Sequence, residues 1–192
     1  MIDAFMCTCA RDRLRQGLAQ ATEERLKQCA GLSLRLVRPP YSDLDFRIRR
    51  RQVCEELSRT PVYLVADDDV LPFDDEFALK GLEIMERNPS FGMVMLRPKW
   101  VEVNDVAWGE NPDIAERGSE VGGLYLIRKG LVTSWPEIVK PEDGWNNWER
   151  DKLSEQGLKV GMFRNLWYLH TGVGFSTLWH NDNSYQHGRC VK

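Results

Sequence analysis

The sequence lacks an apolar run of the roughly 20 residues that a helix needs to span a lipid bilayer. Its N-terminus carries an acid, Asp3, where a secretory signal would carry basic residues. These absences predict a cytoplasmic protein. Basic residues are not in excess either, because the net charge is −3. Composition therefore gives no positive argument for a nucleic-acid partner, although a local basic groove stays compatible with one.

The five cysteines lack the paired spacing of a zinc site, and their number is odd. We therefore expect reduced and mostly buried thiols. Internal repeats and low-complexity linkers are also absent, and 192 residues is within the range of one domain. We interpret residues 1–192 as a single domain, with a polar C-terminal tail from about 171 to 192.

Strand and helix patterns alternate through the first half of the chain, which predicts an α/β fold with a mostly parallel central sheet flanked by helices. In such sheets, ligands bind outside the carboxyl ends of the strands. The region 99–120 has few periodic apolar residues, so we expect a long loop there. The patterns predict strands at 4–9, 32–36, 62–66, 93–96, 121–127, 158–163 and 166–170, and helices at 12–29, 44–58, 74–87 and 145–156.

Three consecutive aspartates, Asp67, Asp68 and Asp69, follow the apolar run 62–66. Crowded carboxylates repel one another unless a cation compensates, and Mn²⁺ or Mg²⁺ binds through carboxylate and phosphate oxygens. Because alternate residues of an extended segment point the same way, Asp67 and Asp69 are expected to face one ligand while Asp68 faces elsewhere. A solvated acidic turn that caps the following helix is the alternative interpretation.

Six short segments occur in a fixed order along the chain: Thr8-Cys9-Ala10-Arg11, Arg50-Arg51-Gln52, Val62 to Val70 with its Asp-x-Asp, Gly122 to Arg128, Glu142-Asp143 and Leu169-His170. With these segments in this order, the sequence resembles the GT-A glycosyltransferases, in particular the large inverting group called family 2. The resemblance covers about residues 4–171, and Gln52 departs from it by replacing the usual Asn.

The resemblance implies a GT-A fold and a metal-dependent transfer of a sugar from a nucleoside-diphosphate sugar, in particular a UDP-sugar, to an acceptor hydroxyl. It implies Mn²⁺ or Mg²⁺ as the cofactor, bound by Asp67, Asp69 and His170. Contacts with the nucleotide-sugar are expected from Thr8, Arg11, Asp43, Arg50, Arg51, Asp67 and Asp68.

An inverting transfer needs a base for the acceptor hydroxyl. The resemblance gives this role to Asp143, with Glu142 beside it. Counting back from Gly157 instead places the base near Asn146 or Asn147, in a segment that resembles the Trp-Asp-Asp-Trp of N-acetylglucosaminyltransferases. Glu149 and Asp151 are further candidates, and a retaining mechanism, or an ordinary acidic loop at 142–143, also stays open.

Two other functions remain alternatives. A degenerate GT-A domain would bind a nucleotide-sugar or a partner without turnover, which Asn146-Asn147 favours. A phosphohydrolase of the haloacid dehalogenase type also begins with a strand and Asp-x-Asp, but Leu71 stands where that family carries Thr or Val. The sequence leaves the acceptor open between a saccharide and a hydroxymethylated DNA base.

Overall fold

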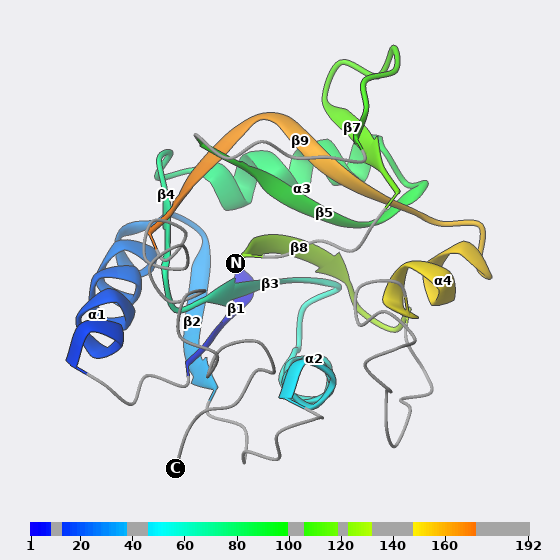
Figure 1. Ribbon diagram of the computed structural model, residues 1–192. Coiled ribbons are helices and arrows are strands. Elements are labelled where there is room, and N and C mark those ends of the chain that lie inside the picture. The colour runs from blue at the N-terminus through cyan, green and yellow to red at the C-terminus, as the bar shows by residue number, and fades with distance from the viewer. Residues whose placement is uncertain (9–12, 38–45, 100–105, 119–122, 132–147, 172–192) are drawn as a thin grey trace, which may run out of the picture.

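A computed structural model describes residues 1–8, 13–37, 46–99, 106–118, 123–131 and 148–171. For residues 14, 15, 46–50, 148 and 149 it describes the backbone alone. These residues form a mixed α/β domain in which helices cover a large central sheet (Figure 1).

The first half of the chain follows the expected alternation of strands and helices. The β1 strand is buried along its whole length and pairs in parallel with both β2 and β3, which places it inside the sheet. The carboxyl ends of β1 and β3 therefore lie side by side, with Cys7 opposite Asp67. The elements are β1 (Ile2–Cys7), α1 (Arg13–Gln28), β2 (Leu32–Val37), α2 (Phe46–Leu57) and β3 (Val62–Asp67).

The second half completes the sheet, whose strand order is β2-β1-β3-β8-β5-β9-β7-β6, with β4 paired to β9. Its elements are β4 (Val70–Pro72), α3 (Phe77–Arg87), β5 (Phe91–Pro98), β6 (Val106–Ala107), β7 (Ile114–Arg117), β8 (Leu124–Arg128), α4 (Trp148–Ser154) and β9 (Lys159–His170).

The sheet is mixed rather than mostly parallel, which corrects one expectation. β8 lies between β3 and β5 and is antiparallel to both, and β4, β6 and β7 also form antiparallel pairs. The parallel pairs are β1–β2, β1–β3 and β5–β9. The physical reason is that β8 is buried on both faces, so its continuous apolar run carries no information about strand direction.

Three further differences concern short or irregular strands. The region 99–120 contains the β6–β7 hairpin, and the two strands expected near the end of the chain form one strand, β9. A register shift between β5 and β9, at Met95 to Arg97, accommodates the polar residues that interrupt the β9 pattern. β4 has only three residues, which is too few to produce a periodic signal.

Helices α2 and α3 cover opposite faces of the sheet at β8. The Arg51 guanidinium on α2 lies 3.9 Å from the centre of the Tyr125 ring. On α3, a Cβ at Gly81 would lie 2.6 Å from Leu126 Cδ1, so the absence of a side chain lets the helix approach this closely. Because Tyr125 and Leu126 are adjacent in a strand, their side chains point to opposite faces.

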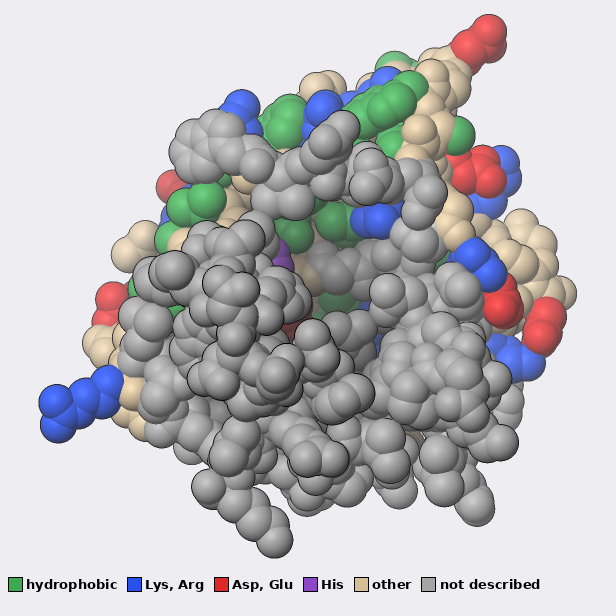
Figure 2. All heavy atoms as spheres, viewed as in Figure 1, with side chains coloured by type: hydrophobic (Ala, Val, Ile, Leu, Met, Phe, Trp, Pro, Cys, Tyr) green, Lys and Arg blue, Asp and Glu red, His purple; other side chains and the backbone are tan. Residues whose placement is uncertain are grey.

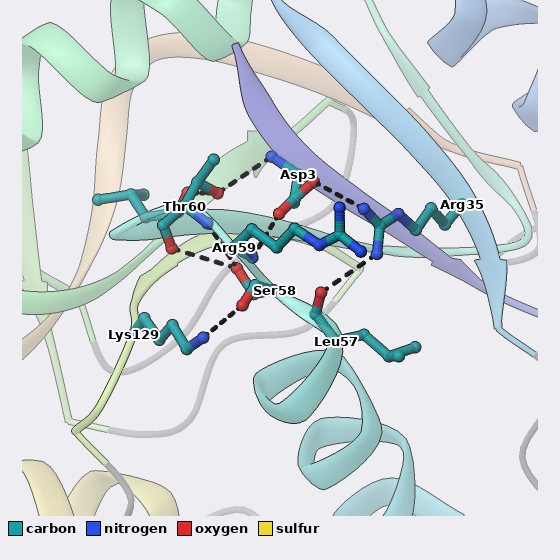
Figure 3. A network of polar contacts seen from close by, with 8 residues as sticks. Asp3, Arg35, Leu57, Ser58, Arg59, Thr60 and Lys129 are labelled. Carbon is teal, nitrogen blue, oxygen red and sulfur yellow. Dashed lines mark hydrogen bonds and ion pairs between the residues drawn. The ribbon is translucent and has the colours of Figure 1, made fainter.

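A polar network at the other end of β1 holds the connection between α2 and β3 (Figure 3). The buried Asp3 carboxylate accepts a 2.6 Å hydrogen bond from the Arg59 backbone N–H and lies 3.5 Å from the Arg35 guanidinium. The Asp3 backbone N–H donates to Thr60 Oγ1 at 3.1 Å. Arg35 also donates to the Leu57 carbonyl, the last residue of α2. These contacts fix where β3 begins.

The cysteines that the structure describes, Cys7, Cys29 and Cys54, are buried and form no disulfide with one another, as expected, and Cys7 Sγ lies 3.8 Å from Cys54 Sγ. Cys9 and Cys190 lie outside the described residues. Burial raises the pKa of the Cys29 thiol above its ordinary value. Among the helices described, none combines the length and the apolar character required to cross a bilayer.

Candidate functional site

The aspartate cluster lies where β3 ends, beside the end of β1. Asp67 is the last residue of β3, and its backbone N–H donates a 2.8 Å hydrogen bond to the Gly123 carbonyl. Asp68 and Asp69 form a turn rather than a continued extended strand, and β4 begins at Val70. The Val70 N–H donates to Thr22 Oγ1 on α1, which anchors the far side of the turn. The cluster is therefore held in place by its neighbours on both sides.

The Asp68 side chain points back toward β1. Its Oδ2 accepts a 2.8 Å hydrogen bond from the Thr8 hydroxyl, and both residues are buried. This hydrogen bond ties together the ends of β1 and β3. That Thr8 and Asp68 contact a nucleotide-sugar stays a prediction.

The Asp69 side chain points toward the end of β9. His170 Nε2 lies 3.1 Å from Asp69 Oδ1, and the Asp69 carboxylate is nearly buried while the imidazole is 28% exposed. The Thr171 N–H and hydroxyl both donate to the Asp69 carbonyl, at 2.8 and 2.9 Å. β4 and β9 are antiparallel with Val70 opposite His170, so the strand pairing itself brings the histidine to the aspartate.

Tyr168 lies on the same side of β9 as His170, because residues two apart in a strand share a face. Their ring centres are 6.1 Å apart. Burial, with the negative charges of Asp67 and Asp69, raises the pKa of the Tyr168 phenol, and Arg117 opposes this in part. Tyr168 thus stays protonated and is a hydrogen-bond donor rather than a base. The turn at Asp68 and Asp69 replaces the extended segment that was expected to point Asp67 and Asp69 at one ligand, and a ligand shared by these two residues stays a prediction.

At Gly123, the backbone lies so close to the Tyr168 side chain that no Cβ fits between them. Its φ of +72° is in the left-handed region, and a Cβ there would collide with the Tyr168 hydroxyl. A glycine at this position therefore lets Tyr168 pack over the start of β8. The same residue accepts, through its carbonyl, the hydrogen bond from the Asp67 backbone N–H.

The Asp69–His170 pair has the spacing that a divalent ion needs. Two adjacent ligands at about 2.1 Å from an octahedral ion are separated by roughly 3 Å, and the two atoms are 3.1 Å apart. Carboxylate oxygen and imidazole nitrogen are both donors that Mn²⁺ accepts. Within the described ranges, no group of three or more His, Cys, Asp or Glu side chains is placed to hold a metal. The pair fits an ion that takes its remaining ligands from water and phosphate.

Two arginines of α2, Arg50 and Arg51, were expected to contact the diphosphate, and the structure describes the side chain of Arg51 alone. Arg51 is 3% exposed; its guanidinium stacks on Tyr125 and lies 3.7 Å from Met93 Sδ. It therefore has a packing role between α2 and the sheet, and its predicted contact with a diphosphate is untested. Arg50 lies in α2 with its side chain outside the description.

Several expected site residues lie outside the described residues: Arg11, Asp43, Glu142 and Asp143, together with Asn146 and Asn147. The side chain of Glu149 is likewise not described. Asp151 is exposed on α4, where it pairs with Arg150 at 2.6 Å.

Three residues of the site were not expected from the sequence: Thr22, Tyr168 and Thr171. Tyr168 carries a signal that was available, because it precedes His170 by two residues in a strand and so shares its face. Thr22 lies on α1 and reaches the Val70 N–H only through a tertiary contact, so no local sequence pattern indicates it.

Comparison with solved structures decides the fold class. A197 from STIV superposes with a TM-score of 0.54 at 12% identity, over 88% of this chain and 85% of that one. A mutant of Drosophila β1,4-galactosyltransferase 7, in complex with manganese, UDP-Gal and xylobiose, gives 0.50 at 16% identity, over 100% and 77%.

A protein described as a glucose-1-phosphate thymidylyltransferase from Bacillus anthracis gives 0.50 at 16% identity, over 92% and 74%. The chain has a GT-A-like fold. No family model matches its sequence, and no curated protein matches it. At these identities the similarity establishes the fold alone, so activity must be argued from the site.

Proposed function

We propose that this chain is a metal-dependent glycosyltransferase that moves a sugar from a nucleoside-diphosphate sugar, in particular a UDP-sugar, to an acceptor hydroxyl with inversion. The observation that carries the proposal is the contact of Asp69 Oδ1 with His170 Nε2, two residues after β3 ends at Asp67, at the edge of the sheet where β1 and β3 end. In α/β sheets this edge is where ligands bind. The galactosyltransferase of similar fold binds manganese and UDP-Gal, which are the ligands proposed here.

Each residue of the site has its own role in this proposal. Asp69 and His170 would hold Mn²⁺ or Mg²⁺ through Oδ1 and Nε2, with Asp67 beside them. When bound, the ion offsets the negative charge that grows on the departing diphosphate. Thr8 holds the Asp68 carboxylate toward β1, and Thr171 fixes the Asp69 backbone. Tyr168, which stays protonated, presents a neutral donor beside two carboxylates. Asp143, with Glu142, remains the predicted base for the acceptor hydroxyl.

A thermal-unfolding screen tests the donor and metal together. A ligand that binds only the folded state at 100 times its Kd stabilises it by about 2.7 kcal/mol, which is roughly 5 to 10 °C in Tm for a chain of this size. We expect UDP with Mn²⁺ to raise Tm by this amount, and UDP without metal to raise it far less. Asp69→Asn should abolish the metal-dependent part, and Glu86→Gln, on the exposed face of α3, should retain it.

Release of free UDP from UDP-sugars separates an enzyme from a domain that only binds. Turnover supports the transferase, whereas a Mn²⁺-dependent shift without turnover on any acceptor supports the binding-domain alternative. If no nucleoside diphosphate or nucleotide-sugar shifts Tm with either metal, the proposal is wrong. Circular dichroism of Asp69→Asn is the control for folding.

A further inference from the structure

Three cations and two tryptophans form one stacked row beside the site. Arg97 lies between the two indoles, 4.6 Å from the ring centre of Trp108 and 4.3 Å from that of Trp167. Lys99 lies 4.6 Å from the Trp167 ring and Arg164 lies 5.2 Å from the Trp108 ring. The order is therefore Arg164, Trp108, Arg97, Trp167, Lys99, and we refer to these five residues as the cation–indole row.

The row lies next to the aspartate site because both use the same stretch of β9. Arg97 on β5 is the register partner of Trp167, and the Lys99 N–H donates to the Tyr168 carbonyl at 2.8 Å. Tyr168 belongs to the site, and Trp167 precedes it with its side chain on the other side of the strand. Figure 2 shows basic and hydrophobic side chains alternating along the upper edge, above a hollow with a histidine side chain at its edge.

Among the described residues, no carboxylate neutralises the positive charge of the row, because none forms an ion pair with Arg97, Lys99 or Arg164. This occurs in a chain whose net charge is −3. Many other basic side chains do form ion pairs, namely Arg25, Lys27, Arg35, Lys80, Arg87, Arg150, Lys152 and Lys159.

The geometry of the row is fixed before any ligand arrives. Arg164 donates hydrogen bonds to the carbonyls of Asn111 and Gly109, in the turn that carries Trp108. The Asn111 side chain in turn accepts from the backbone N–H groups of Asp113 and Ile114. A preformed row loses little conformational entropy on binding, which favours affinity. Trp108 is nevertheless 48% exposed, so the row is accessible from outside.

The stacking decides which ligand chemistry the row fits. Each of the two rings already has two cations of the chain close to its centre, Arg97 and Lys99 at Trp167 and Arg97 and Arg164 at Trp108, so both indoles are engaged by protein cations rather than left open as a platform for nucleobases. A guanidinium stacked on a ring keeps its N–H edge for an anion. Nucleic-acid proteins bind many phosphates through a broad basic surface, whereas this row offers three cations. It suits a few anionic groups on a glycan.

We propose that the cation–indole row binds the anionic groups of an acidic acceptor glycan. This inference rests on the proposed function, and it names the class of acceptor that the site would serve. The row would hold carboxylates or phosphates of the glycan on the face of β9 opposite to Tyr168, so that a glycan passing round the edge of the sheet would present the hydroxyl of another of its sugars to the aspartate site. A nucleic-acid acceptor is the competing outcome.

Binding of matched glycans tests the inference. We would measure binding of carboxymethyl-dextran, unmodified dextran of the same size and a single-stranded DNA oligonucleotide by titration calorimetry, without nucleotide or metal. The first should bind, more weakly at 200 mM than at 50 mM NaCl because salt screens exposed charges, and unmodified dextran should bind at least tenfold more weakly. Arg97→Gln/Lys99→Gln should weaken carboxymethyl-dextran binding at least tenfold.

The control is Lys27→Gln/Arg87→Gln, which removes the same charge from two exposed, ion-paired positions and should leave binding unchanged. Equal binding of both dextrans, tighter binding of DNA, or equal losses in the two double variants would overturn the inference. Circular dichroism and Tm show whether each variant is folded. Because nucleotide and metal are omitted, this result is independent of the UDP–Mn²⁺ shift, and either proposal can fail alone.

Discussion

His170 Nε2 lies 3.1 Å from Asp69 Oδ1, although 101 residues separate them in the chain. The contact exists because β4 pairs with the end of β9 immediately after the aspartate cluster. Any role for the histidine thus depends on this strand pairing as well as on its own chemistry.

His170→Gln should raise the Mn²⁺ concentration that gives half of the UDP-dependent Tm shift by at least tenfold. The substitution replaces the imidazole by an amide, which is a poorer ligand for Mn²⁺. Loss of a group that only hydrogen-bonds to a metal ligand already lowers metal affinity 10- to 100-fold, so loss of a ligand should cost at least as much. Titration of Mn²⁺ at fixed UDP measures this, with Glu86→Gln as the control. An unchanged Mn²⁺ requirement in a folded His170→Gln variant would exclude the histidine from the metal site.

Gly123→Ala should destabilise the fold through two separable effects. The positive φ costs an L-residue about 1 to 2 kcal/mol, and the new Cβ collides with the Tyr168 ring and hydroxyl. In a Tyr168→Phe background the cost should be smaller, because the hydroxyl is gone. Urea unfolding of the four proteins in this double-mutant cycle measures the coupling. Additive losses would mean that the alanine avoids Tyr168.

Asp3→Ala should cost about 1.5 to 3 kcal/mol, the range for a hydrogen bond to a charged group, because it leaves the Arg59 N–H without its acceptor and removes the Arg35 contact. Asp3→Asn keeps one acceptor oxygen and should cost less. Arg35→Gln tests the more exposed half of the network and should cost less than Asp3→Ala. Urea unfolding measures all three, and a loss below 0.5 kcal/mol for Asp3→Ala would contradict this account.

The contribution of Asp74 to stability should disappear in acid. A hydrogen bond from Lys80 and another from the Glu76 backbone N–H hold the pKa of Asp74 below its ordinary value. A carboxyl whose pKa is lower in the folded state stabilises the fold above its unfolded pKa of about 3.9 and loses that contribution as pH falls through the folded pKa. Asp74→Asn should therefore cost about 0.2 to 1 kcal/mol at pH 6, the range for a solvent-exposed ion pair, and less at pH 3. Equal costs in urea at both pH values would refute this.

Much of the fold follows from local patterns in the sequence. The apolar run before Asp67 and the amphipathic spacing of α3 each correspond to an element whose bounds lie close to those expected. The direction of β8 was not available in the same way, because a strand buried on both faces reads identically in either direction. The β6–β7 hairpin was missed because two- and four-residue strands are shorter than one period of any reliable pattern.

For the site, the sequence indicated which residue types matter, and the fold supplied their partners. Asp69 and His170 were expected together only through a family resemblance, and the structure brings them into contact by pairing β4 with β9. Thr8 bonded to Asp68, and Thr171 bonded to the Asp69 carbonyl, depend on tertiary contacts that no local window contains. The metal itself and the base at Asp143 remain predictions.

The path of β9 has a consequence for the order of events during synthesis. This strand runs between β5 and β7 and ends against β4, so a nascent chain lacks His170 and Thr171 until nearly all of the described domain has been translated. The early strands must hold together through their own packing until β9 docks.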